Sequence, residues 1–368
     1  MGGGVLSHSR CKREKQNLEL LIKYNGRGAF LLLRGFPPLP FSKLINVVMK
    51  NIYKLLGGLP LVILSLVGLT SCDKWIYEGF EDCPQAIKVG FYSQTECANQ
   101  KSYPQRVTRL NIYAFDKNDV LYSTHIVDNV RLSDAYEYSI PVDKPGLYSV
   151  LSWGNLADHY YNINGVQVGK TTKQEVLFHL RQEGKWGENL RETTLWYGES
   201  PVVQVERNTT NYERFTPTSV NLREYTNRIA VVIEKIPHPE DYKIEIASSN
   251  GTYQMNGRIA STDSTFYPGE TKVVGDSTCR ADFTTLKLES GHKNTLIVTN
   301  KAKGVEMFRT DLVGVILSSS YAENINLRCL NDFRVRLVAH HCDCPENTYQ
   351  IVEIWVNDWL IHSYSIGV

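Results

Sequence analysis

The sequence predicts an all-β protein with two β-sandwich domains in tandem behind an N-terminal tether. Among its 368 residues are 21 Tyr, 12 Phe and 6 Trp, and Val, Ile and Thr recur in short runs, which favours strands over helices. Turn sequences separate these runs, and no long helical pattern alternates with them, as is typical of sandwiches. With 42% hydrophobic residues, each domain can bury a core of its own.

The charge is divided unevenly between a basic leader and an acidic body. The first 71 residues hold ten Lys or Arg and two Glu. Subtracting these from the chain totals of 40 and 39 leaves 30 basic and 37 acidic residues, a net charge of −7. An acidic body lacks the cationic face that phosphate binding needs, which argues against nucleic acid as a partner. The basic excess belongs to a targeting segment.

Residues 49–71 have the pattern of a lipoprotein signal peptide, and Cys72 is the predicted lipidation site. Two lysines precede residues 55–69, an uncharged, leucine-rich stretch that is too short for a comfortable membrane span. It ends in Leu69-Thr70-Ser71-Cys72, the lipobox pattern of a leucine and two small residues before a cysteine. A diacylglycerol on the Cys72 thiol and an acyl chain on the amine freed by cleavage would together hold the protein on a bilayer. An ordinary signal peptide or a core helix is the alternative.

The segments on either side of this signal are interpreted separately. Residues 1–48 fit no part of the pattern, and Met49-Lys50 has the features of a true start, so we interpret residues 1–48 as an N-terminal extension from a mis-called start codon. Residues 72–84 are acidic and aromatic without a clean period, and they are predicted to form the lipidated tether.

A first β-sandwich is predicted over residues 85–212. Its strands are expected at residues 86–92, 107–115, 120–127, 136–141, 147–153 and 195–206. Leu110, Ile112 and Ala114 would share one face of their strand, and the turn residues Asp116 to Asp119 predict a hairpin after it. Further on the pattern weakens, and we expect a long connection with a little helix around Lys173–Leu180.

A second β-sandwich is predicted over residues 213–368, because the polar, Thr-rich residues 207–217 mark a boundary. Its strands are expected at residues 219–222, 228–236, 242–247, 286–288, 295–299, 312–317, 333–339 and 349–356. The last of these is either a strand that a neighbouring subunit could share or an internal core strand. Both interpretations remain open at this point.

Six cysteines remain after Cys11 in the leader and Cys72. They are Cys83, Cys97, Cys279, Cys329, Cys342 and Cys344. An exported protein meets an oxidising compartment, so pairs can form there. A Cys83–Cys97 bond would close a short loop, and Cys329 could reach Cys342 or Cys344 across a hairpin. Sequence alone does not decide the connectivity.

Five pieces of sequence, in this order, carry a family resemblance. They are Ile76-Tyr77-Glu78-Gly79 with Glu81-Asp82-Cys83-Pro84 just after Cys72, VTRLNIYAFD from Val107 to Asp116, Pro145-Gly146-Leu147-Tyr148 leading to Ser152-Trp153-Gly154-Asn155, Leu222-Arg223-Glu224 to Ile233, and Ile354 to Trp359. Together with the lipobox they resemble the anchoring subunits of Bacteroidales type V fimbriae, the FimB-type fimbrillin-associated anchor lipoproteins.

This resemblance implies a fold, a location and a partner. It implies two transthyretin-like β-sandwiches, lipid attachment to the outer membrane at the cell surface, and a role in seating a pilus of pilin subunits and limiting its length. A sandwich can leave a sheet edge open, which an extended segment of a neighbouring subunit can fill as an added strand. The region of Cys342 and Cys344 and residues 158–189 depart from the family pattern, so no interface residues are transferred.

Enzyme and metal signatures are weak. The sequence contains no GxSxG, HExxH, phosphate-loop or GxGxxG motif, so no catalytic residue is predicted. His340-His341-Cys342-Asp343-Cys344 offers metal-type ligands, but on a strand His341 would face away from His340, Cys342 and Cys344. A disulfide or free thiols are therefore preferred to a metal, and the covalent lipid on Cys72 is the only non-protein group expected.

Two groups of residues have both a functional and a purely structural interpretation. Asp263-Ser264-Thr265 and Asp276-Ser277-Thr278 resemble the O-glycosylation acceptor of exported proteins in this bacterial group, which makes Ser264 and Ser277 candidate sites; plain surface turns are the alternative. The aromatic residues Tyr160, Tyr161, Trp186, Trp196 and Tyr197 could stack on sugars or simply fill the core.

The sequence therefore predicts a structural, non-enzymatic, lipid-anchored subunit that attaches a fimbria to the outer membrane through strand-addition contacts with pilin. A surface glycan-binding lipoprotein that acts beside an outer-membrane transporter is the alternative. No nucleic acid and no small-molecule substrate is expected as a partner.

Overall fold

The computed structural model describes residues 84–191, 193–209, 212–318, 327–341 and 349–363, and two short paired strands, β1 (Lys23–Asn25) and β2 (Gly28–Phe30). Contacts divide the chain into a unit of residues 1–84 and 208–214 and a larger unit of residues 85–207 and 215–368. The predicted signal peptide, Cys72 and tether residues 72–83 lie outside the described residues. Within the described ranges, no helix is long and apolar enough to span a membrane.

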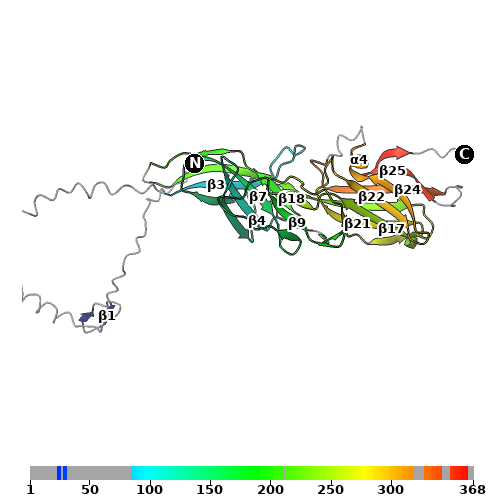
Figure 1. The fold of residues 1–368 in the computed structure, drawn as a ribbon, viewed down its shortest axis with the longest axis horizontal. Coiled ribbons are helices and arrows are strands. Elements are labelled where there is room, and N and C mark those ends of the chain that lie inside the picture. The colour runs from blue at the N-terminus through cyan, green and yellow to red at the C-terminus, as the bar shows by residue number, and fades with distance from the viewer. Residues whose placement is uncertain are drawn as a thin grey trace, which may run out of the picture. The chain divides into compact units, whose positions relative to one another are not determined.

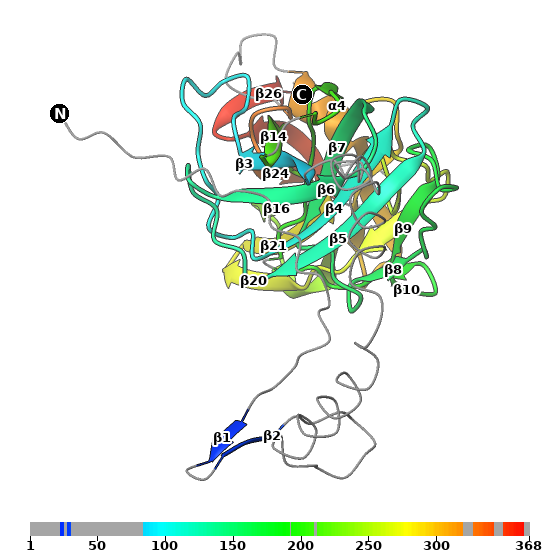
Figure 2. The same cartoon turned by 90° about the vertical axis from the view of Figure 1, so that its left-hand side faces the viewer.

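The first sandwich packs a three-stranded sheet against a larger one. In the small sheet, β3 (Gln85–Tyr92) lies between β14 (Arg214–Asn221) and β6 (Glu137–Val142). The larger sheet has the order β15-β12-β7-β4-β5 and consists of β4 (Arg109–Asp116), β5 (Leu121–Asp128), β7 (Gly146–Gly154), β12 (Trp196–Glu199) and β15 (Arg223–Glu224), with β13 (Val203–Val205) also paired to β7. Figure 2 shows β4 and β5 side by side.

Alternating side chains fill the space between these two sheets. Ile87 and Val89 from β3 are fully buried against Leu110 and Ile112 from β4, which confirms the period of two seen in the sequence. Strand β14 pairs with β3 and β15 pairs with β12, so both strands belong to the first sandwich although they follow residue 212.

A third layer covers the other face of the larger sheet. It has the order β18-β9-β8 and consists of β8 (Tyr161–Ile163), β9 (Val176–Leu180) and β18 (Thr252–Gln254). The helix predicted around Lys173–Leu180 is wrong, because β9 occupies its second half. Its hydrogen-bonding partners β8 and β18 lie before and long after it in the chain, so a local sequence window could not show them.

The second sandwich packs two six-stranded sheets. One has the order β20-β21-β16-β24-β25-β26 and consists of β16 (Thr226–Glu234), β20 (Thr271–Gly275), β21 (Thr278–Leu286), β24 (Asp332–His341), β25 (Tyr349–Val356) and β26 (Trp359–Ser363). The other has the order β10-β11-β19-β17-β22-β23 and consists of β10 (Gln182–Glu183), β11 (Trp186–Gly187), β17 (Tyr242–Ser248), β19 (Thr265–Tyr267), β22 (Asn294–Asn300) and β23 (Val305–Asp311). A 3-10 turn, η1 (Pro239–Asp241), precedes β17.

One element of this sandwich differs in kind from its prediction. Residues 312–317 were expected as a strand and form the helix α4 (Leu312–Leu317). A short apolar run does not distinguish a strand from a buried helix. Here the side chain of Asp311 accepts a hydrogen bond from the backbone N–H of Val313. This N-cap stabilises the first turn and so favours the helix.

The strand at residues 349–356 is internal. β25 pairs with β24 on one side and with β26 on the other, so the core-strand interpretation is confirmed. Strand β26 was not predicted, and it follows a two-residue turn in which Asn357 and Asp358 both have positive φ, as a type I′ hairpin requires.

The two sandwiches exchange short strands. The β10–β11 hairpin, which precedes most of the second sandwich in sequence, adds to its sheet through a parallel pairing of Trp186 with Phe266. In return, β18 from the second half of the chain adds to β9 beneath the first sandwich. Figure 1 shows β9 and β18 together, with β17, β21 and β22 grouped beyond them. Either sandwich therefore contains strands from both halves of the sequence.

Candidate functional site

Strand β3 is the first strand after the predicted tether. It lies in the middle of its sheet, and its register with β6 runs without a break from Gln85 opposite Val142 to Gly90 opposite Glu137. Ile87 and Val89 are fully buried, and Phe91 is nearly so. Any pull on the tether would therefore act first on a strand that is held by hydrogen bonds on both edges and by a core on one face.

The chain after β3 is fastened to the end of β14. The backbone N–H of Leu222 donates to the Tyr92 carbonyl (2.7 Å). The Gln94 N–H donates to Asn221 Oδ1 (2.9 Å), while Asn221 Nδ2 donates to the Gln94 carbonyl (2.9 Å). These bonds hold the loop that carries Cys97 against the body of the first sandwich.

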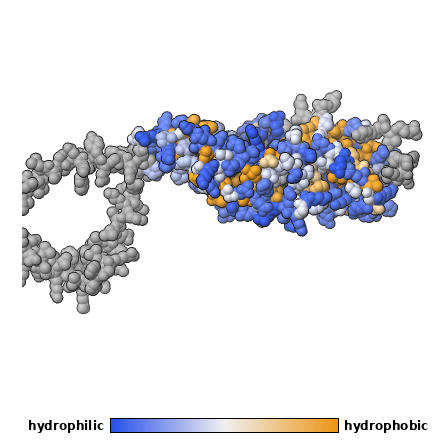
Figure 3. All heavy atoms as spheres, viewed as in Figure 1, coloured by the Kyte–Doolittle hydropathy of each residue, from blue (hydrophilic) through white to orange (hydrophobic). Residues whose placement is uncertain are grey.

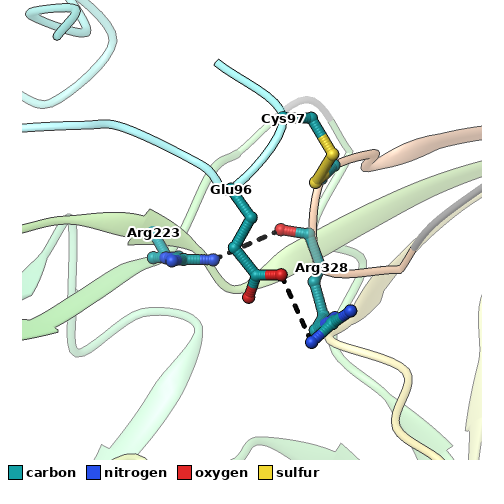
Figure 4. Close-up of a disulfide and its surroundings, with 5 residues drawn as sticks. Glu96, Cys97, Arg223 and Arg328 are labelled. Carbon is teal, nitrogen blue, oxygen red and sulfur yellow. Dashed lines mark hydrogen bonds and ion pairs between the residues drawn. A yellow bond between two sulfur atoms is a disulfide. The ribbon is translucent and has the colours of Figure 1, made fainter. Parts of the chain in front are cut away.

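A disulfide joins this loop to the second sandwich. Cys97 is bonded to Cys329, 232 residues away in sequence, with a Cα–Cα distance of 5.9 Å that is usual for such bonds. Figure 4 shows the surroundings: Glu96 pairs with Arg328 (Oε2–Nη1, 3.2 Å), and Arg223 Nη1 donates to the Arg328 carbonyl (3.5 Å). Both charged side chains of the Glu96–Arg328 pair are largely exposed, so this pair adds little stability by itself.

The disulfide corrects the pairings considered from the sequence. A Cys83–Cys97 bond and a bond from Cys329 to Cys342 or Cys344 are both wrong, because Cys97 and Cys329 are bonded to each other. Short separation along the chain suggested those pairs, whereas the packing of the sandwiches brings two distant loops together. Cys83, Cys342 and Cys344 lie outside the described residues.

An aromatic cluster beneath the larger sheet of the first sandwich connects distant parts of the chain. Trp153 is fully buried, and its ring contacts Phe178 (centroids 5.1 Å apart), Tyr197 (4.8 Å), Tyr225 (5.5 Å) and Tyr253 (5.9 Å). Its Nε1 donates to the Met255 carbonyl (3.1 Å). Because Tyr253 and Met255 come from the second half of the chain, this cluster ties the halves together. We call the disulfide, its loops and this cluster the junction.

The aromatic residues considered as a sugar-stacking surface are mostly core. Tyr161, Trp196 and Tyr197 are buried, and Tyr160 packs against the core from a half-buried position. Trp186 lies against Phe266, with Lys243 Nζ 5.1 Å from its ring centroid. The core-filling alternative is therefore confirmed for the three buried rings, which weakens the glycan-binding interpretation.

The other predicted site residues do not assemble into a reactive centre. Ser264 and Ser277 are exposed, and their glycosylation stays a prediction. His340 and His341 are exposed at the end of β24. Burial raises the pKa of the Cys279 thiol to about 11, which keeps it protonated and unreactive at neutral pH. In the part of the chain that the structure describes, no group of three His, Cys, Asp or Glu side chains could hold a metal ion.

An arginine bridge lies where the second sandwich begins. Arg228 donates from Nε to Asp332 Oδ1 (2.5 Å) and from Nη2 to Asp332 Oδ2 (2.9 Å), and its Nη1 pairs with Glu224. The hydrogen bonds from Arg228 hold the pKa of the Asp332 carboxyl below its ordinary value.

This bridge predicts a small acid sensitivity. Because the Asp332 pKa is lower folded than unfolded, the bridge stabilises fully above the unfolded pKa of about 4 and is lost as pH falls through the folded pKa. We expect Asp332→Asn to lower the free energy of unfolding by less than about 1 kcal/mol at pH 7, since Asp332 is largely exposed. Urea denaturation at pH 7 and pH 3 measures this. The difference in the free energy of unfolding between Asp332→Asn and wild type should be smaller at pH 3 than at pH 7. Asp276→Asn, on an exposed turn, should have the same free energy of unfolding as wild type at either pH.

Two edge strands of one sheet carry exposed apolar side chains. Val273 and Val274 are exposed on β20, and Trp359 and Leu360 on β26, the two ends of the six-stranded sheet in the described chain. In the view of Figure 3 most of the described surface is hydrophilic, and hydrophobic residues gather at the end that carries β22, β24 and β25. Edge strands with exposed apolar residues are places where another strand can add.

Comparisons with known proteins place this architecture in one family. The model for fimbrillin-A associated anchor proteins Mfa1 and Mfa2 matches residues 80–365. The minor fimbrium anchoring subunit Mfa2 of Porphyromonas gingivalis is 58% identical over 316 residues, which cover 86% of this chain and 97% of that protein. The structure of the Porphyromonas gingivalis fimbrial anchor protein Mfa2 matches with a TM-score of 0.73 at 58% identity, covering 77% of this chain and all of the other.

A more distant structure shares the fold. A DUF1812 protein from Bacteroides thetaiotaomicron matches with a TM-score of 0.61 at 22% identity, covering 76% of this chain and 98% of the other. At that identity the likeness shows the β-sandwich architecture alone.

Proposed function

Because the chain belongs to the family of fimbrillin-A associated anchor proteins Mfa1 and Mfa2, we propose that it attaches a fimbria to the outer membrane. The observation that carries this proposal is the likeness to a fimbrial anchoring subunit over nearly that protein's full length. The role is structural: the protein holds a polymer in place and performs no reaction. Its position at the cell surface follows from that role.

A lipid on Cys72 is the proposed attachment. The lipobox that ends at Cys72 supports it, and several acyl chains, at about 0.8 kcal/mol per buried CH₂, suffice for lasting attachment. Twelve residues separate Cys72 from β3, so the anchor would be joined to the folded body by a short tether. O-glycans on Ser264 and Ser277 would lie on exposed turns.

Pilin is proposed to bind by strand addition at an open sheet edge. The apolar side chains exposed on β20 and β26 support this, because backbone hydrogen bonds along such an edge give strength and side-chain pockets give selectivity. A subunit that is fixed to the membrane can extend a polymer in one direction only. This asymmetry would let the anchor end growth at the base and so limit the length of the fimbria.

Deletion of the gene and complementation with wild type or Cys72→Ala test the proposal. We expect fimbriae in the culture medium from the deletion strain and from Cys72→Ala cells, and fimbriae retained on cells with the wild-type chain. Electron microscopy and the ratio of pilin in medium to pilin on cells measure this. Cys279→Ala is the control for loss of a thiol. Retained fimbriae of normal length in the deletion strain would refute anchoring, whereas retention in Cys72→Ala alone would refute the lipid.

A further inference from the structure

We propose that the Cys97–Cys329 disulfide is a mechanical stop that halts unravelling of the anchor under load and passes the tension into the second sandwich. The inference rests on the proposed function, in which the pull of a fimbria enters the folded body through the N-terminal tether. It assigns to this disulfide a role in bearing force, which is separate from membrane attachment and from pilin binding.

Tension would reach β3 before any other part of the two sandwiches. Gln85 directly follows Pro84, the last tether residue, and β3 is held to β6 and β14 by noncovalent bonds alone. Such bonds open at a rate that governs forced unfolding, however stable the protein is at equilibrium. Loss of β3 would take Ile87, Val89 and Phe91 out of the core of the first sandwich.

The disulfide stands directly behind this first strand. Cys97 follows the end of β3 at Tyr92 and precedes β4, which begins at Arg109. If β3 and the Gln94–Asn221 hydrogen bonds gave way, the pulled chain would become taut at Cys97 before β4 was loaded. Peeling would therefore end at a covalent bond and leave the larger sheet of the first sandwich in place.

From Cys97 the tension passes to a strongly held strand. Cys329 lies three residues before β24, which pairs with β16 from Arg228 to Glu234 and with β25 on its other edge. Val335 and Leu337 of β24 are fully buried in the second core. A pull through Cys329 thus acts on a central strand of a six-stranded sheet, whereas the chain between the two cysteines is bypassed.

The neighbouring contacts keep this path short. Glu96 pairs with Arg328, and Arg223 donates to the Arg328 carbonyl, so the residues beside both cysteines are already drawn together before any load is applied. Once β3 has detached, little chain beyond Gln94 has to straighten before the covalent connection carries tension. An ordinary stabilising disulfide needs no such position directly behind the strand that receives the tether.

Single-molecule pulling of the chain from Asp73 to Val368, held at both ends, tests the proposal. With the bond intact, 24 residues before Cys97 and 39 after Cys329 can extend. The released contour length should therefore not exceed about 220 Å. After reduction, or in Cys97→Ser/Cys329→Ser, the bypassed chain between positions 97 and 329, a separation of 232, should add about 800 Å. Cys279→Ala should keep the short limit. An unreduced wild-type chain that releases the long contour would overturn the proposal.

The role in cells is tested under flow. We expect cells that carry Cys97→Ser/Cys329→Ser to retain fimbriae at rest and to lose at least several times more of them than wild type under shear. Equal retention of fimbriae under shear would overturn the mechanical role. Failure of anchoring itself would be recognised separately, because deletion cells would then keep their fimbriae without flow. Reduction of the purified wild-type chain gives the same comparison if the double variant folds poorly.

Discussion

Replacement of Trp153 with alanine is expected to lower the free energy of unfolding by about 3–5 kcal/mol. Trp153 is fully buried, and its ring is surrounded by aromatic rings from both halves of the chain. The substitution leaves a large cavity between β7 and the layer of β9 and β18, and it leaves the Met255 carbonyl without its donor. The cavity and the missing hydrogen bond both weaken the packing of β7 against residues 253–255.

Urea denaturation followed by far-ultraviolet circular dichroism measures this effect. Trp359→Ala is the matched control, because that ring is exposed on β26, and we expect a loss below about 1 kcal/mol there. The loss of unfolding free energy for Trp153→Phe should lie between those for Trp153→Ala and Trp359→Ala, since phenylalanine keeps an aromatic ring but removes the hydrogen-bond donor. Equal losses of unfolding free energy for Trp153→Ala and Trp359→Ala would contradict a stabilising role of the cluster.

Removal of the Cys97–Cys329 disulfide is expected to cost a similar amount at equilibrium. A bond between residues 232 positions apart restricts the unfolded chain strongly, and chain-entropy arguments give about 5.5 kcal/mol for a loop of this size. The Glu96–Arg328 pair beside it does not compensate, because it is exposed. The unfolding midpoint of Cys97→Ser/Cys329→Ser should therefore fall well below that of the oxidised wild type.

A reductant provides the control for this prediction. Treatment with a phosphine reductant should lower the wild-type midpoint to that of the double variant and should leave the double variant unchanged. A wild-type midpoint that does not respond to the reductant would contradict the expected contribution of the bond. Cys279 is buried and unpaired, so it should not contribute to the difference.

Strand existence was predictable where the side chains alternate between two faces. In β3 Ile87, Val89 and Phe91 are buried at every second position, and in β4 alternate side chains enter two different cores; both strands were predicted within two residues of their ends. The shortest strands, such as β8, β10 and β18, were missed, because two or three residues carry no period. α4 was taken for a strand since its apolar run is ambiguous and only the Asp311 cap resolves it.

The residues of the junction were only partly predictable. Trp153 stood in a strongly apolar strand and was expected in the family pattern, yet its partners Tyr225 and Tyr253 lie far along the chain. Cys97 and Cys329 were recognised as cysteines able to pair, but not with each other. No spacing or composition signal links two loops that are 232 residues apart.

Local sequence was enough to show which side chains alternate in β3, where the acidic body begins and which cysteine ends a lipobox, because these features depend on neighbours along the chain. Tertiary structure alone decided the exchange of β10, β11 and β18 between the sandwiches and the bond from Cys97 to Cys329. The physical reason is that periodicity is a local property. Which distant strand or cysteine a residue pairs with depends on which packed arrangement offsets the entropy lost in closing long loops.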